Sequence, residues 1–218
     1  MPRTLDKSDI RVRTRILFAD VRGLAAHRQW LRIQICPFEK LLPHVPAGST
    51  LLDIGCGGGL FLGLLALGDP TLCATGVDAS SDAINCAISM ANKLRLSGLK
   101  FYCADSIEKW PTDLYTVVSL IDVLHHILPT DRETFFNEAA KRVASGGTLI
   151  CKEMRPKPRW KAAANVLHDL VVARQWIRHS TAESIESWAA KARLRLIRHE
   201  EWDRLWYAHG FWVFRREA

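Results

Sequence analysis

The sequence predicts an α/β fold in which helices cover both faces of a mostly parallel, doubly wound β-sheet. Two observations predict it. Short apolar runs alternate with helical patterns through the middle of the chain, and strand, helix, strand repeated in this way gives a parallel sheet. The 218 residues are 48 % hydrophobic and 24 % charged, which suffices for one domain with a core and excludes a disordered or collagen-like chain.

Five strands and three helices are expected in the middle of the chain. The strands are 50–54, 72–77, 99–103, 115–121 and 148–152. The helices are 60–67, 80–96 and 131–144. Ser80 is expected to cap the second helix, because its hydroxyl can accept a backbone N–H of the first turn, and the pair Gly146-Gly147 is expected to stop the third.

The flanks carry elements of their own. The expected helices are 16–35, 38–42, 159–178 and 182–192, and the expected strands are 194–199 and 207–214. The two strands should pair antiparallel, because their connection is too short for a parallel crossover. We expect a helical N-terminal segment at 1–49 and a main domain at 50–218, with an inserted cap at 155–192.

Composition argues against export, a membrane span and a metal. The longest apolar stretch, Leu60 to Leu67, is far shorter than the ~20 residues of a transmembrane helix, and the N-terminus lacks the apolar core of a secretory signal. The six cysteines form no CxxC pair and have no histidines at zinc spacing. We therefore expect a soluble, cytoplasmic protein with reduced thiols and no metal site.

Charge is divided unevenly along the chain. Lys and Arg outnumber Asp and Glu by 9 to 4 in residues 1–49 and by 13 to 7 in residues 155–218, whereas the middle has 8 against 12. The balance of +5, −4 and +6 gives the net charge of +7. Basic flanks can meet a phosphate-bearing partner or an anionic membrane surface, or they can be solvated faces with no partner.

A glycine-rich turn follows the first expected strand of the core. The strand ends in Asp53 and runs into Gly55, Gly57 and Gly59, which let the backbone turn sharply and approach a ligand with no Cβ in the way. A tight turn that binds nothing fits the same residues, so the glycines alone do not identify a ligand.

Two more acids stand at expected strand ends. Asp78 follows the second strand, where it can accept both hydroxyls of a ribose, and Asp105 follows the third, where it can accept a hydrogen bond from an adenine amine. Each acid taken singly also fits a helix cap or a turn. Ligands of open parallel sheets bind at the carboxyl ends of the strands, so Asp53, Asp78 and Asp105 are expected to surround one crevice.

Taken in order, the motifs resemble those of the class I S-adenosylmethionine-dependent methyltransferases. The matching pieces are LLDIGCGGG at 51–59, GVDAS at 76–80, CADS at 103–106, IDVLHHI at 121–127 and ASGGTLICKE at 144–153. The resemblance implies a Rossmann-like sheet of seven strands with an antiparallel last strand, a helical cap, and S-adenosylmethionine as the cofactor. The cofactor-binding residues that it implies are Asp53, Gly55, Cys56, Gly57, Gly59, Asp78, Ala79, Asp105, Ser106, Ile121 and Asp122.

The residues also favour this cofactor over a dinucleotide. In the dinucleotide fingerprint the third glycine comes three residues after the second, where this sequence has Leu60. A pyrophosphate needs positive surroundings, whereas S-adenosylmethionine carries a sulfonium and an ammonium and suits an acid-lined pocket. By the resemblance, Asp53 orients the glycine turn and the methionine amine, Asp78 holds the ribose, and Asp105 meets the adenine.

Three histidines are candidates for acceptor chemistry. His125 and His126 follow the fourth strand, and neighbouring helical positions point about 100° apart, so one of the two is expected to face the pocket. By the resemblance, His126 matches the histidine common at this place in the family, as a base or as a positioning residue. His168 shares an expected helix face with Asn165 and Asp169 and can reach the acceptor if that helix is a lid, although an ordinary amphipathic helix shows the same pattern.

The sequence thus favours an enzyme that transfers a methyl group from S-adenosylmethionine to a small-molecule or lipid-like acceptor, an aromatic one included. An RNA or tRNA methyltransferase is the alternative because of the net charge of +7, and a cofactor-binding module without turnover is the third reading. Nucleic acid is the less favoured partner, since the chain has no Asn/Asp-Pro-Pro-aromatic tetrapeptide and no Pro-Cys nucleophile. Basic residues around the apolar stripe of 155–178 leave peripheral contact with an anionic membrane open.

Overall fold

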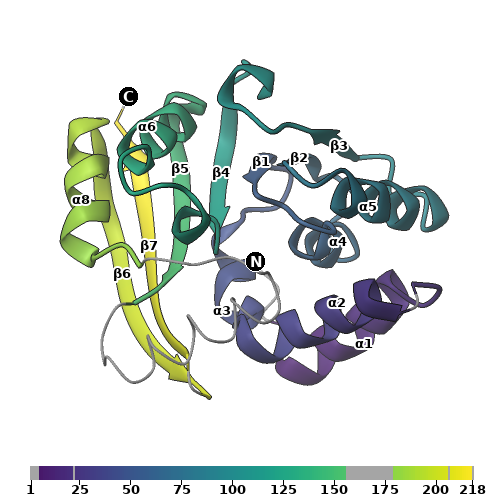
Figure 1. Ribbon diagram of the computed structural model, residues 1–218. Coiled ribbons are helices and arrows are strands. Elements are labelled where there is room, and N and C mark those ends of the chain that lie inside the picture. Colours follow the sequence, from purple (N-terminus) through teal and green to yellow (C-terminus); the bar gives the residue numbers. More distant parts are fainter. Residues whose placement is uncertain (1–4, 22, 156–178, 206, 218) are drawn as a thin grey trace. The chain divides into compact units, whose positions relative to one another are not determined.

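The computed structural model describes residues 5–21, 23–155, 179–205 and 207–217, and the chain forms two compact units (Figure 1). The first unit is Met1–Pro111 and the second is Thr112–Ala218. Each unit contains strands and the helices that pack on them.

The first unit is built on three parallel strands in the order β3-β2-β1. They are β1 (Thr50–Ile54), β2 (Cys73–Asp78) and β3 (Leu99–Cys103). Ile54 pairs with Val77, and Asp78 pairs with Cys103, so the carboxyl ends of the three strands meet at one edge. This edge carries the glycine-rich turn.

Helices cover these strands. They are α1 (Lys7–Leu17), α2 (Gly23–Ile35), α3 (Phe38–Leu41), α4 (Leu60–Ala66) and α5 (Ser81–Lys93), with the 3-10 turns η1 (Leu42–His44) and η2 (Ile107–Lys109). Helix α5 packs on β2 and β3, and α1 packs against α4. Ser80 caps α5 as predicted, since its hydroxyl oxygen accepts the Ala83 N–H at 3.3 Å.

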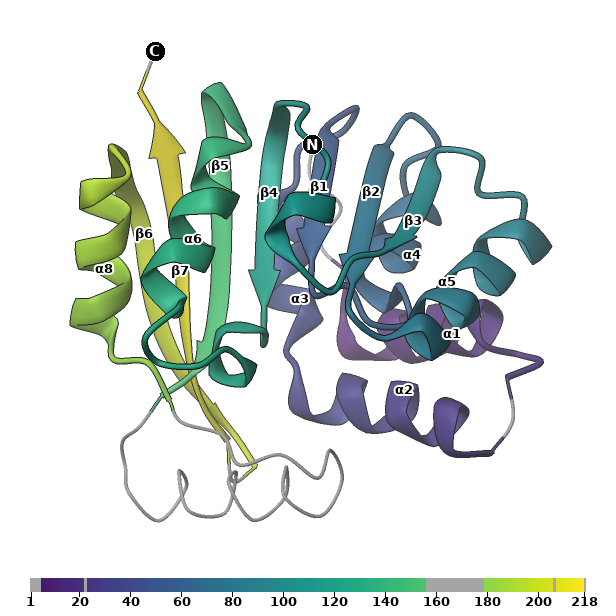
Figure 2. The ribbon, with the colours of Figure 1, turned by 45° about the horizontal axis from the view of Figure 1, so that its top comes forward.

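The second unit contains four strands in the order β4-β5-β7-β6, with β7 antiparallel to both of its neighbours (Figure 2). The strands are β4 (Tyr115–Ile121), β5 (Val143–Met154), β6 (Leu194–Arg204) and β7 (Tyr207–Arg216). The helices are α6 (Arg132–Lys141) and α8 (Ala182–Lys191), with the 3-10 turn η3 (Leu124–His126). The Phe136 ring of α6 lies 6.0 Å from Trp188 of α8 and 6.1 Å from Phe214 of β7, so both helices pack on one face of the strands.

The predicted fold class is confirmed. The sheet has seven strands in the order β3-β2-β1-β4-β5-β7-β6, and β7 is the antiparallel last strand. The predicted antiparallel pairing of the two C-terminal strands is confirmed as well. Among the helices that the structure describes, none is long and apolar enough to cross a membrane.

The N-terminal helices differ from the prediction of one helix at 16–35. Helix α1 begins at Lys7 and already ends at Leu17. A capping box starts it, because the Asp6 carboxylate accepts the Asp9 N–H at 2.8 Å and the Asp9 carboxylate accepts the Asp6 N–H at 3.2 Å. The box has the sequence Asp-x-x-Asp and not the usual Ser-x-x-Glu. A prediction from the spacing of apolar residues therefore misses the start of this helix.

The end of α6 also differs from the prediction. The helix stops at Lys141, and the pair Gly146-Gly147 lies inside β5, where the pairing register with β4 shifts. Gly146 has a φ of 71°, and a Cβ on Gly147 would lie 2.9 Å from the Thr116 carbonyl oxygen. The two glycines therefore form a strand irregularity and do not stop the helix.

The expected cap at 155–192 falls only partly within the described residues. The helix expected at 182–192 is confirmed as α8, which packs on β6 and α6. The helix expected at 159–178 lies outside the described residues, and His168 lies there with it. The cap therefore stays a prediction.

Candidate active site

The glycine-rich turn after β1 is held by the neighbouring strand β2. Gly55, Gly57 and Gly59 have φ angles of 80°, 54° and 77°, a region that favours glycine. The Val77 carbonyl accepts the Gly55 N–H at 2.8 Å and the Cys56 N–H at 3.0 Å. The turn is thus fixed by the strand next to it, and it leads directly into α4.

Asp78, the last residue of β2, ties the turn to its own strand end. One carboxylate oxygen accepts the Gly57 N–H at 2.8 Å, and the other accepts the Ser80 N–H at 2.9 Å. The Ala104 N–H donates to the Asp78 carbonyl at 2.9 Å, which brings the end of β3 to the same place. Asp78 is half-buried, so its side chain is still accessible to a ligand.

The glycines of this region differ in what surrounds them. A Cβ on Gly59 would lie 2.9 Å from the Phe101 ring and 3.0 Å from Ala87, and a Cβ on Gly76 of β2 would lie 2.7 Å from the same ring. Both positions are therefore small because the protein packs against them. The Cβ position of Gly57 has no atom of the described residues within 4 Å, so a ligand can approach the backbone there.

The turn is electronegative. Burial raises the pKa of the Cys56 thiol well above its usual range, and the charges of Asp53 and Asp78 raise that pKa further. Asp53 itself is only 2 % exposed. A negative potential beside open space favours a cationic ligand. S-adenosylmethionine carries two positive groups, a sulfonium and an ammonium, and so suits this turn.

The residues expected near the adenine lie at the surface. Asp105, Ser106 and Ala79 are all exposed. Lys109 lies 2.8 Å from Asp105, and the hydrogen bond and charge of Lys109 lower the pKa of that carboxyl. Asp105 is therefore already paired, and its contact with an adenine stays a prediction.

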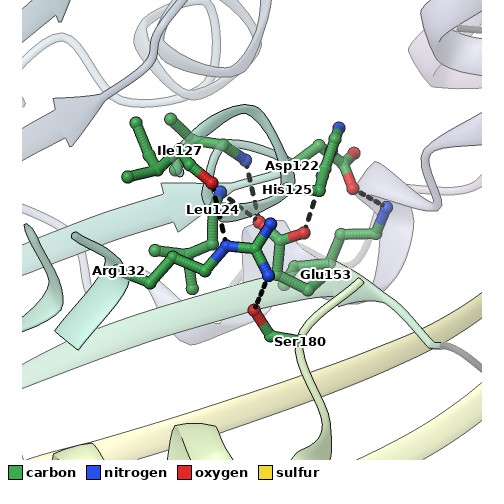
Figure 3. A network of polar contacts seen from close by, with 9 residues as sticks. Asp122, Leu124, His125, Ile127, Arg132, Glu153 and Ser180 are labelled. Atoms are coloured by element: carbon green, nitrogen blue, oxygen red, sulfur yellow. Dashed lines mark hydrogen bonds and ion pairs between the residues drawn. The ribbon is translucent and has the colours of Figure 1, made fainter. Parts of the chain in front are cut away.

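A buried polar network follows β4 in the second unit (Figure 3). The Glu153 side chain is 1 % exposed, and one of its carboxylate oxygens accepts the N–H groups of Val123 and Leu124 at 2.8 and 2.7 Å. The other oxygen lies 2.7 Å from Nδ1 of His125, whose side chain is 3 % exposed. One carboxylate therefore fixes both the turn η3 and the orientation of the His125 ring.

The contact with Glu153 selects the tautomer of His125. An ionised carboxylate only accepts hydrogen bonds, so Nδ1 carries the hydrogen, and in the neutral ring Nε2 then carries the lone pair. The two side chains are turned toward each other in Figure 3, and Nε2 lies on the far side of the ring. A histidine held in this way can take a proton at Nε2, while the carboxylate stabilises the positive ring that results.

His126 stands in a different environment. It is exposed, and its ring lies 4.1 Å from the His125 ring at a tilt of 47°. One of the two neighbouring histidines is thus buried and held by a carboxylate, and the other is exposed; which of them faces the acceptor stays a prediction.

Asp122 and Lys152 form a second pair beside this network. Lys152 Nζ lies 2.5 Å from Asp122 Oδ1, and the Asp122 N–H donates to the Lys152 carbonyl at 2.8 Å. Asp122 follows the buried Ile121 and has a φ of 55°, an uncommon conformation for a residue other than glycine. Its place is therefore set by the pair with Lys152 across two parallel strands.

Three of these side chains are close enough to hold a metal ion. Ligand atoms of Asp122, His125 and Glu153 all lie within 4.8 Å of one another. However, Lys152 already neutralises Asp122, and two backbone N–H groups already bind Glu153. The arrangement is complete as an ion-pair and hydrogen-bond network, and we assign no metal to it.

Sequence reasoning misses the roles of Lys152, Glu153 and Arg132. The available signal is a pair of adjacent charges inside an otherwise apolar strand, because buried charges are rare without partners. Arg132 is 4 % exposed, donates through Nε to the Ile127 carbonyl at 3.0 Å, and donates through Nη1 to the Ser180 hydroxyl at 3.2 Å (Figure 3). Nothing in a helical pattern marks it as buried.

The strand order and the glycine-rich turn after β1 fit a class I methyltransferase. The chain belongs to the methyltransferase domain family, whose pattern matches residues 27–199. The cofactor of this class is S-adenosylmethionine.

Similar proteins agree with this assignment. The ubiquinone biosynthesis O-methyltransferase of Bradyrhizobium sp. (strain ORS 278) is 28 % identical over 138 residues, which are 63 % of this chain and 51 % of that protein. The chain spans between 27 % and 55 % of the length of the curated relatives that it matches.

Solved structures share the fold. An O-methyltransferase family protein from Burkholderia thailandensis has a TM-score of 0.75 at 18 % identity, covering 93 % of this chain and 62 % of that one. The magnesium protoporphyrin IX methyltransferase of Synechocystis PCC 6803, solved with bound S-adenosylhomocysteine, has a TM-score of 0.67 at 17 % identity, covering 97 % and 95 %.

Proposed function

We propose that this chain methylates a hydroxyl oxygen of a small aromatic or lipid-like acceptor and that His125 accepts the proton. The observation that carries the proposal is the buried His125–Glu153 pair directly after β4. A phenol has a pKa near 10, so at neutral pH it must lose a proton as its oxygen is methylated, and a neutral histidine is suited to take it. The relatives named for ubiquinone biosynthesis are O-methyltransferases, which supports oxygen as the acceptor atom.

The roles of the residues follow from their contacts. When bound, S-adenosylmethionine supplies a methyl group on a positively charged sulfur. Transfer of this methyl group to the acceptor oxygen would break the C–S bond and form the C–O bond, and Nε2 of His125 would take the hydroxyl proton. Glu153 keeps the hydrogen on Nδ1 and stabilises the charged ring, so the products are the methyl ether and S-adenosylhomocysteine. The glycine turn and Asp78 position the methyl donor.

The variant Glu153→Gln tests this role without removing the support of η3. A glutamine oxygen can still accept the N–H groups of Val123 and Leu124, but its NH₂ group faces Nδ1 of His125 and moves the ring hydrogen to Nε2. A ring protonated on Nε2 cannot take the proton of the acceptor. We therefore expect kcat to fall by about 100-fold or more, with an unchanged Kd for S-adenosylhomocysteine.

His126→Gln is the matched control, because it changes the neighbouring but exposed histidine. We expect a loss of at most about threefold for it and a loss of about 100-fold for His125→Gln. The proposal is wrong if Glu153→Gln and His125→Gln both keep more than a third of the activity. It is also wrong if His126→Gln alone removes activity, because His126 would then be the proton acceptor.

The acceptor is identified with deuterium-labelled methyl donor and mass spectrometry. We expect label on the oxygen of phenolic acceptors, with and without an apolar tail, and none on RNA. Labelled tRNA, bound with an affinity that falls steeply with salt, would instead establish the RNA methyltransferase alternative. Donor binding with no labelled product from any acceptor would leave the third reading, a cofactor-binding module.

A further inference from the structure

The turn η3, which carries both histidines, is held at its N–H end by a buried acid. The Glu153 carboxylate accepts the N–H groups of Val123 and Leu124 through one oxygen and contacts the His125 ring through the other. The ring and the backbone of the turn thus share one carboxylate. A movement of η3 relative to Glu153 would therefore also change the contact that orients the ring.

A second buried charge holds the opposite end of η3 (Figure 3). Ile127 closes the turn, since its N–H donates to the Leu124 carbonyl at 3.1 Å. The Ile127 carbonyl in turn accepts the Nε–H of Arg132 at 3.0 Å, and Arg132 is 4 % exposed. A continuous series of hydrogen bonds therefore joins Arg132 to Glu153 through the backbone of η3.

The place of Arg132 in α6 is unfavourable for the helix itself. It is the first residue of α6, and the N-terminal turn of a helix is stabilised by acids and destabilised by cations. Burial of a cation adds a further cost. Arg142, at the other end of α6, is a buried arginine in the favourable place, and its Nη1 donates to the Glu138 carbonyl at 2.7 Å. Support of α6 therefore accounts for Arg142 but not for Arg132.

Residues that break such a local rule are expected at functional sites, and the turn that Arg132 holds carries the proposed proton acceptor. A base must stay within hydrogen-bond reach of the proton that it takes, and a displacement of about 1 Å can cost about 100-fold in rate. We propose that Arg132 is a positioning residue, which holds η3 so that Glu153 keeps the His125 ring in its productive orientation. The inference rests on the proposed function and adds to it a residue that acts through the backbone of η3.

Arg132→Met tests the inference through kcat. Methionine fills much of the same space but donates no hydrogen bond to the Ile127 carbonyl, so we expect kcat to fall about 10-fold or more. The KM for a phenolic acceptor and the Kd for S-adenosylhomocysteine should change by less than about twofold. Arg132→Lys should recover most of the activity, with a loss of about threefold, because an ammonium still donates to the carbonyl but lacks the fixed planar geometry of a guanidinium.

Arg142→Met is the matched control for stability, because it removes the second buried arginine, which donates to a backbone carbonyl at the far end of α6. We expect it to lower the Tm by an amount comparable to Arg132→Met and to change kcat by less than about twofold. Ser180→Ala removes the hydroxyl that accepts the Nη1–H of Arg132 and leaves the bond to Ile127, so its kcat should also stay within about twofold. Rates are measured at a temperature at which melting curves show each variant to be folded.

Nitrogen-15 NMR of the histidine rings gives a readout that a loss of stability alone does not change. Each tautomer of a neutral ring has its own pair of nitrogen shifts, and the His125 signals are those absent from His125→Gln. At a pH at which the ring is neutral, we expect only the tautomer with hydrogen on Nδ1 in the natural chain and in Arg142→Met. In Arg132→Met we expect a second tautomer, because the ring no longer keeps its contact with Glu153. If Arg132→Met does not fold, Arg132→Lys must show this second tautomer together with its loss of kcat.

The outcomes separate this inference from the proposed function. An unchanged His125 tautomer in Arg132→Met overturns the inference, as does an equal loss of kcat in Arg142→Met. Both results leave the proposed function intact if His125→Gln removes activity. Conversely, activity that persists in His125→Gln overturns the proposed function, whereas a second tautomer in Arg132→Met still supports the positioning of the ring by Arg132.

Discussion

At the scale of the residue, the glycines of the turn are not equivalent. Gly57 and Gly59 both have positive φ angles, but only Gly59 is packed against Phe101 and Ala87. We expect Gly57→Ala to cost about 1–2 kcal/mol of unfolding free energy, for the backbone conformation alone, and to weaken S-adenosylhomocysteine at least about 10-fold, because its Cβ enters the open space. Urea unfolding and calorimetry measure the two effects.

Gly59→Ala is the matched variant for this prediction. It adds a clash in the core to the same backbone cost, so its loss of stability should exceed that of Gly57→Ala by about 1–3 kcal/mol. Equal losses of stability together with an unchanged ligand affinity for Gly57→Ala would show that the open space beside Gly57 is not used by the cofactor.

Cysteine reactivity is a second test at this scale. Burial, with the charges of Asp53 and Asp78, holds the pKa of the Cys56 thiol well above its usual range, so this thiol stays neutral at pH values where an ordinary cysteine is partly thiolate. We expect iodoacetamide at pH 8 to label the exposed Cys73 and Cys103 and to leave Cys56 unlabelled, as read by peptide mass spectrometry. Labelling of all three in denaturant is the control, and fast labelling of native Cys56 would contradict the electronegative, buried turn.

Sequence reasoning succeeds for residues whose role lies in a local pattern. Asp78 was predictable because it follows an apolar strand at a fixed distance from the glycines, and the structure shows it bound to the Gly57 N–H. Glu153 was not, because its role depends on His125, 28 positions away along the chain.

At the scale of the element, the strands of the core were predictable within a residue or two at most ends. Buried strands are short apolar runs between turn residues, and this signal is local. The start of α1 was not predictable, because its capping box is formed by Asp6 and Asp9 and not by the usual Ser and Glu. The full length of β5 was not predictable either, because Gly146 lies at an irregularity inside the strand. A glycine pair fits a helix stop and a bent strand equally well, and the partner strand decides between them.

Arg132 is a buried cation that links the residue after η3 to Ser180, which lies just before α8. Arg132 supports the Ile127 carbonyl after η3 and the Ser180 hydroxyl before α8. We expect Arg132→Met to lower the unfolding free energy by about 2–3 kcal/mol, because it removes charge-assisted hydrogen bonds and leaves buried acceptors without them. Chemical unfolding measures this loss.

Arg132→Lys is the matched variant, since it keeps the charge but cannot reach both acceptors in the planar geometry of a guanidinium. Its loss of stability should lie between that of the methionine variant and zero. A change below about 0.5 kcal/mol in Arg132→Met would mean that these hydrogen bonds contribute nothing net to stability.

At the scale of the whole molecule, the order of strands and helices predicted the fold class, and the motifs, through their resemblance to those of the methyltransferases, predicted the cofactor. Neither identifies the acceptor, because the same fold serves many unrelated acceptors. The acceptor cannot be predicted in this way, because side chains from distant segments of the chain recognise it. His168 and the expected cap helix lie outside the described residues, so their part in acceptor choice stays a prediction.

Cofactor choice is a property of the whole chain that unfolding can measure. A ligand that binds only the folded state at 100 times its Kd stabilises it by about 2.7 kcal/mol, and each kcal/mol raises the Tm of a chain of this size by about 2–4 °C. We therefore expect S-adenosylhomocysteine to raise the Tm by roughly 5–10 °C, and NAD to leave it unchanged, because an electronegative turn beside Asp53 and Asp78 repels a pyrophosphate. Asp78→Asn keeps an oxygen for the Gly57 N–H but turns its NH₂ group toward the Ser80 N–H, which loses its acceptor. Its Tm without ligand should therefore fall somewhat, and most of the further shift with S-adenosylhomocysteine should be lost. A shift with NAD equal to that with S-adenosylhomocysteine would overturn the assignment of the cofactor, whereas a full shift in Asp78→Asn would overturn only the role of that carboxylate.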